Sequence, residues 1–251
     1  MKVHFVGSGP GDPELLTLKA KRILESCQVL IYAGSLVSEV IVAMAPQAAE
    51  KHDSAGMDLE AIVKVVEDAA AKGLDVVRLH SGDPSIYGAI REQIAELEKR
   101  GIEYDVTPGI SSFQASAAAL GVELTVPEKS QTIILTRMAG RTPVPEEQDI
   151  EKLAATRSTL CVFLSVDRIA KLAETVGRHY GAGAPMAVVF HASRPDQLII
   201  RGAVEDIAAK VKEAGVKKTA MIVVGDALGV GGQASLLYDK NFSHEYRKAG
   251  A

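Results

Sequence analysis

The sequence predicts an α/β protein built of two α/β lobes. Short runs of β-branched residues alternate with longer segments of helical periodicity, which is typical of α/β domains. The pattern restarts after a helix-free stretch at 121–130 that contains Pro127. With 251 residues, of which 47% are apolar, the chain is long enough for two modest cores without disulfides. We therefore expect an N-terminal lobe at 1–122 and a C-terminal lobe at 123–251.

In the first half, glycines at positions 73, 101 and 121 stand where helices end. They help to delimit strand 2–6, helix 13–26, strand 28–32, helix 37–44, helix 58–73, strand 75–80, helix 84–101, strand 103–107 and helix 111–120.

The second half has fewer helices and more consecutive strands. Its pattern predicts strand 131–136, strand 159–165, helix 167–180, strands 186–192 and 197–202, helix 205–214 and strand 219–228. The segment 137–149 contains two prolines and two arginines and is too polar for a buried strand, so we expect a loop over a cleft.

Composition excludes several classes of protein. A net charge of −4, no basic block and 4% aromatic residues argue against a nucleic-acid binder. No apolar run reaches the ~18 residues of a membrane span. Cys27 and Cys161 are far apart, and no secretion signal follows Met1. We expect a cytoplasmic protein with no nucleic-acid or membrane partner.

The first strand runs into a glycine-rich loop, Gly7 to Asp12, that raises the question of a dinucleotide site. Such a site needs a helix opening on the pyrophosphate and an acidic residue ~20 positions later. The next strand ends without a carboxylate, and Pro10 offers no N–H to a phosphate. Asp12 and Pro13 instead resemble a helix N-cap and first turn. We therefore expect a turn that shapes a pocket wall.

Two further loops repeat this chemistry at predicted strand ends. Ser81-Gly82-Asp83-Pro84 couples a glycine to a helix start, and Pro108 to Ser112 offers two hydroxyls at a helix N-terminus. Open α/β sheets bind ligands at this edge, which favours a binding site made of three loops. The alternative is that all three are ordinary turns with capping residues.

Several motifs along nearly the whole chain resemble the tetrapyrrole (corrin and porphyrin) methyltransferase family. In order they are VGSGPGDPELLTLKA, RLHSGDPSIYG, TPGISSFQASAAALGVELT, TLCVFLS and PMAVVFHASRPDQLIIRG with TAMIVVG. Within the family, IYAGSLVSEVI and LTRMAGRTPVPE look most like the precorrin-4 or cobalt-precorrin-4 C-11 methyltransferases of cobalamin biosynthesis.

The resemblance implies a homodimer of two-lobed chains, with S-adenosyl-L-methionine in a cofactor cleft between the lobes and S-adenosyl-L-homocysteine as product. Relatives carry Gly-Gly-Asp where this chain has Ser81-Gly82-Asp83, and the extra Cβ of Ser81 is tolerated if only backbone atoms of that position meet the ligand. The residues it implies for cofactor binding are Pro10, Ser81, Gly82, Asp83, Ile86, Ser111, Ser112, Leu164 and Ala192.

Methyl transfer from a sulfonium releases a neutral leaving group, so alignment of the two reactants is the main requirement. This explains the lack of an obvious nucleophile or catalytic dyad in the sequence. The catalytic residue is unknown. Asp83 is the best candidate for a polar contact with the cofactor, and a plain helix cap is the alternative.

A tetrapyrrole substrate carries acetates and propionates, which arginines pair well. Arg137, Arg141, Arg194 and Tyr87 are candidates for substrate binding, with solvated or packing roles as alternatives. No histidine or cysteine spacing suggests a metal site, and none is expected. His80 and His191 end strands and are candidates to approach the substrate.

Three other functions compete with this one. The enzyme could act on another tetrapyrrole, such as uroporphyrinogen III or another precorrin. A nicotinamide oxidoreductase is disfavoured by the missing ribose carboxylate. A non-catalytic tetrapyrrole carrier would bind the ring without transferring a methyl group.

Overall fold

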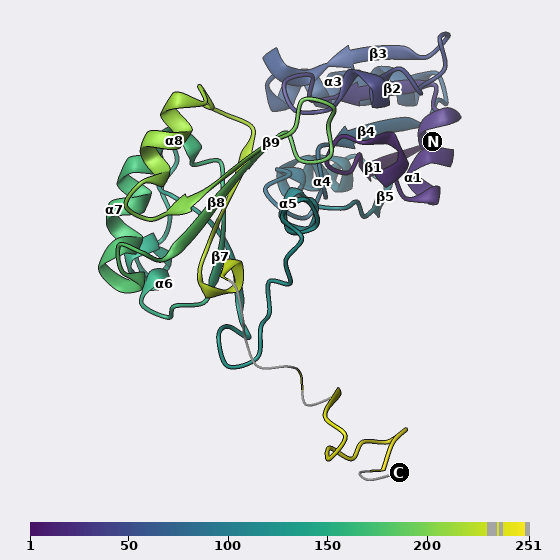
Figure 1. Ribbon diagram of the computed structural model, residues 1–251. Coiled ribbons are helices and arrows are strands. Elements are labelled where there is room, and N and C mark those ends of the chain that lie inside the picture. The colour runs from purple at the N-terminus through teal and green to yellow at the C-terminus, as the bar shows by residue number, and fades with distance from the viewer. Residues whose placement is uncertain (230–234, 236–237, 249–251) are drawn as a thin grey trace. The chain divides into compact units, whose positions relative to one another are not determined.

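The computed structural model describes residues 1–229, 235 and 238–248. The chain forms two compact units. The first unit contains Met1–Ser116 and His191–Gln197, and the second contains Ala117–Phe190 and the chain from Leu198 onward (Figure 1). Each unit has its own five-stranded sheet, in agreement with the predicted α/β class. The units differ from the predicted lobes because segment 191–197 packs with the first unit.

The first unit is built on a parallel sheet with strand order β3-β2-β4-β1-β5. Its strands are β1 (Lys2–Gly7), β2 (Val29–Tyr32), β3 (Glu50–Asp53), β4 (Val76–His80) and β5 (Glu103–Thr107). Strand β1 lies between β4 and β5, so the three loops singled out in the sequence leave neighbouring strands at the same edge. The neighbour relation that the binding-edge hypothesis requires is therefore present.

Helices cover both faces of this sheet, as a parallel sheet requires. They are α1 (Leu18–Glu25), α2 (Glu39–Val42), α3 (Leu59–Ala71) and α4 (Ile90–Lys99). The next helix, α5 (Ser112–Leu120), begins in the first unit and ends in the second. Leu24 of α1 and Ile41 of α2 pack with Leu79 on one face. Val66 of α3 and Leu97 of α4 pack with the opposite face. Two cores therefore fix the strand ends from both sides.

Two predicted helices begin later than expected. Asp12 caps a short 3-10 turn, Pro13–Leu15, by accepting the Glu14 N–H at 2.9 Å, and α1 starts only after Thr17. The segment 84–89 forms an irregular turn, and α4 starts at Ile90. Both boundaries were placed too early because the helical periodicity continues through the turns that precede the helices.

The second unit has a mixed sheet with strand order β6-β7-β10-β8-β9. Its strands are β6 (Ile133–Arg137), β7 (Thr159–Phe163), β8 (Pro185–Phe190), β9 (Leu198–Ala203) and β10 (Ala220–Val224). Helices α6 (Ile150–Ala154), α7 (Ile169–Tyr180) and α8 (Ile207–Glu213) form one apolar core with it. The predicted strands 186–192 and 197–202 form an antiparallel pair, and the segment between them belongs to the first unit.

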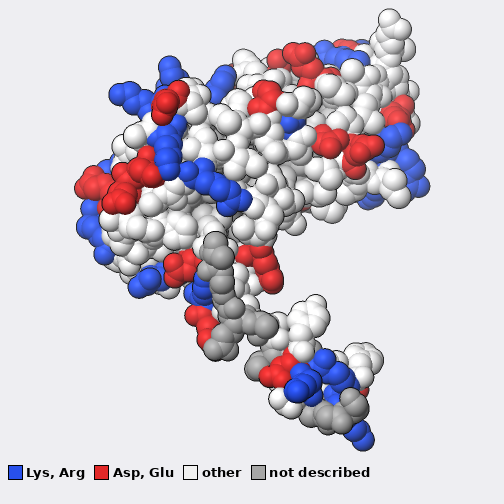
Figure 2. All heavy atoms as spheres, viewed as in Figure 1, with Lys and Arg blue, Asp and Glu red and all other residues white. Residues whose placement is uncertain are grey.

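On the face shown in Figure 2, basic and acidic side chains are interspersed, in keeping with the small net charge of −4. Among the described residues, no helix has the length and apolar character that a membrane span demands.

Candidate functional site

The loops after β1 and β4 are joined by backbone hydrogen bonds. The Ser8 N–H donates to the His80 carbonyl at 2.7 Å. Gly9 and Gly82 exchange two further bonds, from Gly9 N–H at 3.2 Å and from Gly82 N–H at 2.8 Å. This bridge continues the pairing of the sheet past the strand ends and makes the two loops one surface.

Glycines allow the three loops to touch. A Cβ on Gly7 would lie 2.6 Å from both the Gly109 nitrogen and the Gly82 oxygen. A Cβ on Gly109 would lie 2.2 Å from the same Gly82 oxygen. No side chain fits at these contacts, so the backbones of all three loops meet directly. Gly82 itself has a φ of +65°, a conformation that glycine adopts at little cost.

Asp83 connects the second loop to the third. One carboxylate oxygen accepts the Ser85 N–H at 2.8 Å, and the other accepts the Gly109 N–H at 2.9 Å. Hydrogen bonds to a charged acceptor are stronger than neutral ones. Asp83 therefore caps its own turn, as one of the two sequence hypotheses stated, and also fixes the loop that follows β5.

These bonds bear on the dinucleotide question. Phosphate sites use free backbone N–H groups. Here the N–H groups of Gly9, Gly82 and Gly109 are bonded within the protein. The Asp12 N–H donates to the Ser193 hydroxyl at 3.1 Å. The loops also contain two carboxylates and no lysine or arginine. They are unsuited to a pyrophosphate.

Segment 191–197 brings a fourth wall to this edge. Arg194 donates from Nε to the Pro10 carbonyl at 3.5 Å and from a terminal nitrogen to the Leu36 carbonyl. A Cβ on Gly11 would lie 2.6 Å from the Arg194 side chain. Ala192 is buried in the same segment. Arg194 is therefore engaged with backbone carbonyls of the first unit, a role that the sequence did not suggest.

The third loop leads into α5 through a side-chain cap. The Ser111 N–H donates to the Gln114 side-chain oxygen at 3.0 Å, which is one half of a capping box. Ser111 is buried, and Ser112 is the first residue of α5. The predicted helix start is confirmed to within one residue.

Three buried side chains have a polar atom without a hydrogen-bond partner in the described part of the chain: His80 Nε2, Thr107 Oγ1 and Ser116 Oγ. His80 and Thr107 are the last residues of β4 and β5. Burial, together with the charge of Arg78, lowers the pKa of His80 to about 3, so its imidazole is neutral. Sequence reasoning named His80 but missed Thr107 and Ser116, whose only signal is their position at strand end and helix face.

Unfavourable backbone conformations occur at several of the candidate positions. The candidates Tyr87, Leu164 and His191 have φ values of 55°, 51° and 47°, and Ser193, which is not a candidate, has a φ of 69°. Each costs on the order of 1–3 kcal/mol for a residue with a side chain, and such strain is often retained at functional sites.

The remaining candidates belong to the second unit. Leu164 follows β7 and is 61% exposed. Arg137 donates to the carbonyls of its own loop, at 3.2 Å to Thr142 and 2.7 Å to Pro143, and so shapes that loop. Arg141 is exposed and has no hydrogen bond or ion pair with a described residue.

The first unit thus brings together most of the predicted site. The residues on its strand-end loops and on segment 191–197 are Pro10, Ser81, Gly82, Asp83, Ile86, Tyr87, Ser111, Ser112, Ala192 and Arg194. Within the described ranges, no group of three or more histidine, cysteine or acidic side chains could hold a metal ion.

Comparison with known proteins decides the family. A model of the tetrapyrrole (corrin/porphyrin) methylases matches residues 2–208. The chain belongs to the tetrapyrrole methylase family. The resemblance drawn from the motifs is thereby confirmed.

Relatives within the tetrapyrrole methylases are similar over nearly their full length. Cobalt-precorrin-4 C(11)-methyltransferase of Methanocaldococcus jannaschii is 53% identical over 99% of this chain and 96% of the relative. Precorrin-4 C(11)-methyltransferase of Pseudomonas aeruginosa is 48% identical over 98% and 99%. An S-adenosyl-L-methionine-dependent uroporphyrinogen III methyltransferase of Methanosarcina barkeri is 37% identical over 90% and 92%.

Solved structures of tetrapyrrole methylases share the fold. A cobalt precorrin-4 methyltransferase superposes with a TM-score of 0.88 at 41% identity, covering 90% of this chain and 95% of that one. Uroporphyrin-III C-methyltransferase from Thermus thermophilus, complexed with S-adenyl homocysteine, gives 0.77 at 30% identity, covering 93% and 96%.

Proposed function

We propose that this chain is an S-adenosyl-L-methionine-dependent C-methyltransferase that converts precorrin-4, or cobalt-precorrin-4, to the C-11-methylated product in cobalamin biosynthesis. The observation that carries the proposal is the identity of 53% and 48% with two C(11)-methyltransferases, against 37% with a uroporphyrinogen III methyltransferase, each over nine tenths of the chain or more.

The strand-end loops have the right chemistry for this cofactor. S-adenosyl-L-methionine has no phosphate, and its sulfonium and ammonium groups attract oxygen atoms. The loops carry the carboxylates of Asp12 and Asp83 and no basic side chain, and the N–H groups of Gly9, Gly82 and Gly109 are already bonded. His80 Nε2 and Thr107 Oγ1, at the ends of two of these strands, have no partner among the described residues and can each form a further hydrogen bond. These residues therefore fit the cofactor.

We infer that the cofactor contacts follow the resemblance. The proposed residues are Pro10, Ser81, Gly82, Asp83, Ile86, Ser111, Ser112, Leu164 and Ala192. Gly82 lies beside two of the other proposed residues, because a Cβ there would be in van der Waals contact with Ser111 and Ser112, at 3.6 and 3.8 Å. When bound, the cofactor supplies an activated methyl group and leaves as the neutral S-adenosyl-L-homocysteine.

The protein's own task is alignment and exclusion of water. Asp83 fixes the second loop against the third, and the Gly9 to Gly82 bridge fixes the first against the second. A rigid surface of this kind holds a reacting group in line without loss of further entropy at the moment of reaction. No acid is needed for a neutral leaving group, and no catalytic acid or base is assigned.

Carboxylates of the substrate need cations, and we propose Arg141 as the main one. Its guanidinium is exposed and has no partner among the described residues, whereas Arg137 and Arg194 already donate to backbone carbonyls. Tyr87, 47% exposed on the turn after Asp83, is the proposed substrate contact in the first unit.

A direct assay tests the function. The purified protein is incubated with S-adenosyl-L-methionine and, separately, with precorrin-4, cobalt-precorrin-4, other precorrins and uroporphyrinogen III. Mass spectrometry then detects an added methyl group, and NMR locates it on the ring. Methylation of uroporphyrinogen III alone would contradict the proposal and favour the alternative substrate.

We also propose a homodimer located in the cytoplasm, as the family resemblance implies. Light scattering coupled to size-exclusion chromatography measures the mass in solution, and fractionation of cells locates the protein. A monomer at micromolar concentration would contradict the dimer.

A further inference from the structure

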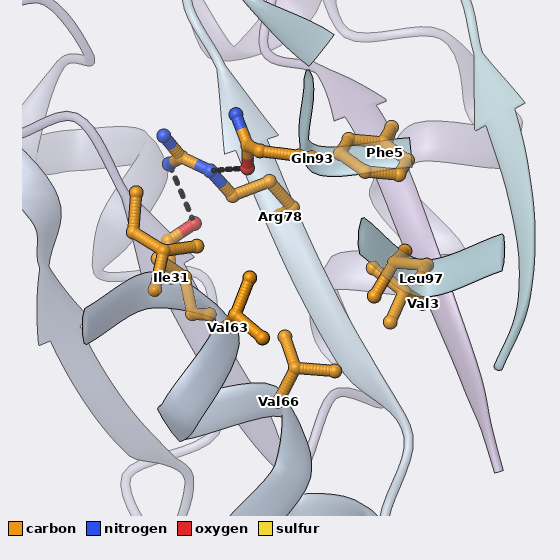
Figure 3. Close-up of a pocket in the computed structure, with 9 residues that line it drawn as sticks. Val3, Phe5, Ile31, Val63, Val66, Arg78, Gln93 and Leu97 are labelled. Carbon is orange, nitrogen blue, oxygen red and sulfur yellow. Dashed lines mark hydrogen bonds between the residues drawn. The ribbon is translucent and has the colours of Figure 1, made fainter. Parts of the chain in front are cut away.

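A buried polar chain joins the middle of β4 to the start of α4 (Figure 3). Arg78, 7% exposed, donates from Nε to the side-chain oxygen of Gln93 at 3.1 Å and from a terminal nitrogen to the Ile31 carbonyl at 3.5 Å. Gln93, also 7% exposed, donates from its own amide nitrogen to the Ala89 carbonyl at 2.8 Å. Gln93 therefore links a buried cation to the residue just before α4.

The surroundings of Arg78 and Gln93 are apolar. Arg78 and Gln93 line one small cavity. The other lining residues are Val3, Phe5, Ile31, Ile62, Val63, Val66 and Leu97. No ion pair joins Arg78 to a described carboxylate. A guanidinium only donates and a carbonyl only accepts, so the amide of Gln93 has one possible orientation. The side-chain oxygen of Gln93 accepts from Arg78, and its nitrogen donates to Ala89.

The turn that Gln93 contacts is strained. Tyr87 and Ala89 have φ values of +55° and +50°, and neither is a glycine. A Cβ on Gly88, which stands between them, would lie 2.1 Å from the Pro84 oxygen. A backbone in this state persists only where its surroundings hold it.

Side chains hold the turn at both ends. Asp83 fixes its start through Ser85 and Gly109, and Gln93 fixes its end through the Ala89 carbonyl. Tyr87 lies between these two attachments and is 47% exposed. The bond that Gln93 donates therefore acts on the stretch of backbone that carries Tyr87.

We propose that Arg78 and Gln93 are positioning residues that fix the Tyr87–Ala89 turn, and with it the placement of Tyr87 for the tetrapyrrole substrate. Arg78 orients the amide of Gln93, and Gln93 holds the turn. The substrate part of this inference rests on the proposed function, but the structural part does not.

The substitution Gln93→Glu separates the two bonds. Glutamate keeps an acceptor for Arg78, so the buried cation remains paired, but it has no donor for the Ala89 carbonyl. If Gln93 only pairs Arg78 and does not hold the turn, the variant folds and its hydrogen exchange over residues 85–89 is unchanged. The proposal predicts normal thermal unfolding together with amide hydrogen exchange over residues 85–89 that is about 3- to 10-fold faster, the factor expected for one lost hydrogen bond. The control is Glu92→Gln, the reverse substitution at the neighbouring exposed position. We expect it to leave amide hydrogen exchange over residues 85–89 unchanged.

Kinetics then test the consequence for the substrate. In Gln93→Glu the KM for the tetrapyrrole rises about 3- to 10-fold, while kcat and the affinity for S-adenosyl-L-homocysteine stay near wild type. If the wild-type protein transfers no methyl group, the proposed function fails, and hydrogen exchange still decides the structural part.

A second variant guards against failure to fold. Gln93→Met keeps the length of the side chain but donates no hydrogen bond, so the Ala89 carbonyl loses its donor in this variant too. Faster exchange over 85–89 in either folded variant supports the inference. Wild-type exchange in a folded variant overturns it, and faster exchange with an unchanged KM overturns the assignment of Tyr87 to the substrate.

Discussion

The Asp83 carboxylate accepts the Gly109 N–H at 2.9 Å and so joins the loop after β4 to the loop after β5, 26 positions away in the chain. Its second oxygen accepts the Ser85 N–H at 2.8 Å. One side chain therefore determines the relative position of two of the three strand-end loops, and its loss has effects beyond its own turn.

Replacing Asp83 by Ala removes both bonds and leaves two backbone N–H groups without their acceptor. A hydrogen bond to a charged group contributes about 1.5–3 kcal/mol. We expect the affinity for S-adenosyl-L-homocysteine, measured by isothermal titration calorimetry, to fall by at least about tenfold, with helix content by circular dichroism close to wild type. Asp58→Ala, which removes the N-cap hydrogen bond of α3 beyond the edge strand β3, is the control. Equal affinity in the two variants would show that Asp83 is only a cap.

Gly11→Ala tests the contact with Arg194. The new Cβ would overlap the Arg194 side chain, which would move and lose its bonds to the Pro10 and Leu36 carbonyls. We expect a lower melting temperature and weaker cofactor binding. Gly73→Ala is a matched control because Gly73 also has a positive φ, +67°, but open space around it. The same loss in both variants would mean that backbone strain alone is responsible.

Arg141→Lys tests the proposed substrate cation. Guanidinium pairs a carboxylate through two bonds, whereas an ammonium acts as a point charge. The KM for the tetrapyrrole should rise several-fold, with cofactor affinity unchanged, and the difference should shrink as salt screens the attraction. Arg91→Lys, an exposed arginine on α4, serves as control. Full activity of Arg141→Ala at low salt would place the substrate carboxylates elsewhere.

The buried His80 predicts a loss of stability in acid. Its pKa in the folded protein is lowered to about 3, chiefly by burial, from the ordinary histidine value of 6.5. The unfolded chain therefore binds the proton first, and the stabilisation from a neutral His80 is complete above pH 6.5 and declines as the pH falls towards 3. Urea unfolding at several pH values measures this. In His80→Gln the decline should be shallower, and parallel curves for both proteins would refute the assignment.

Sequence patterns were sufficient for the class of fold and for bringing the three strand-end loops to one edge of the first unit's sheet. Alternating strands and helices are read directly from periodicity, and Asp12 with Pro13 correctly marks a capped turn, although α1 itself begins only after Thr17. The strand-end loops could be placed together because parallel neighbours end at one edge.

Other features depend on contacts distant in sequence. Strand β3, with the sequence EKHD, is an edge strand whose charged residues give no apolar signal. The turn at 84–89 keeps its shape through Gln93 and Asp83, which no local pattern indicates. The assignment of Arg194 to the Pro10 carbonyl required the packing of segment 191–197, which periodicity does not describe.

That segment also affects the order in which the protein can be completed during synthesis. The first unit is encoded by the first 116 residues and by residues 191–197. Because a ribosome delivers the chain from its N-terminus, a nascent first unit lacks Arg194, and the Pro10 and Leu36 carbonyls lack their donor, until most of the second unit has emerged. The strand-end loops would then acquire their final shape only after strand β8 has left the exit tunnel, which delays a competent binding surface until late in translation.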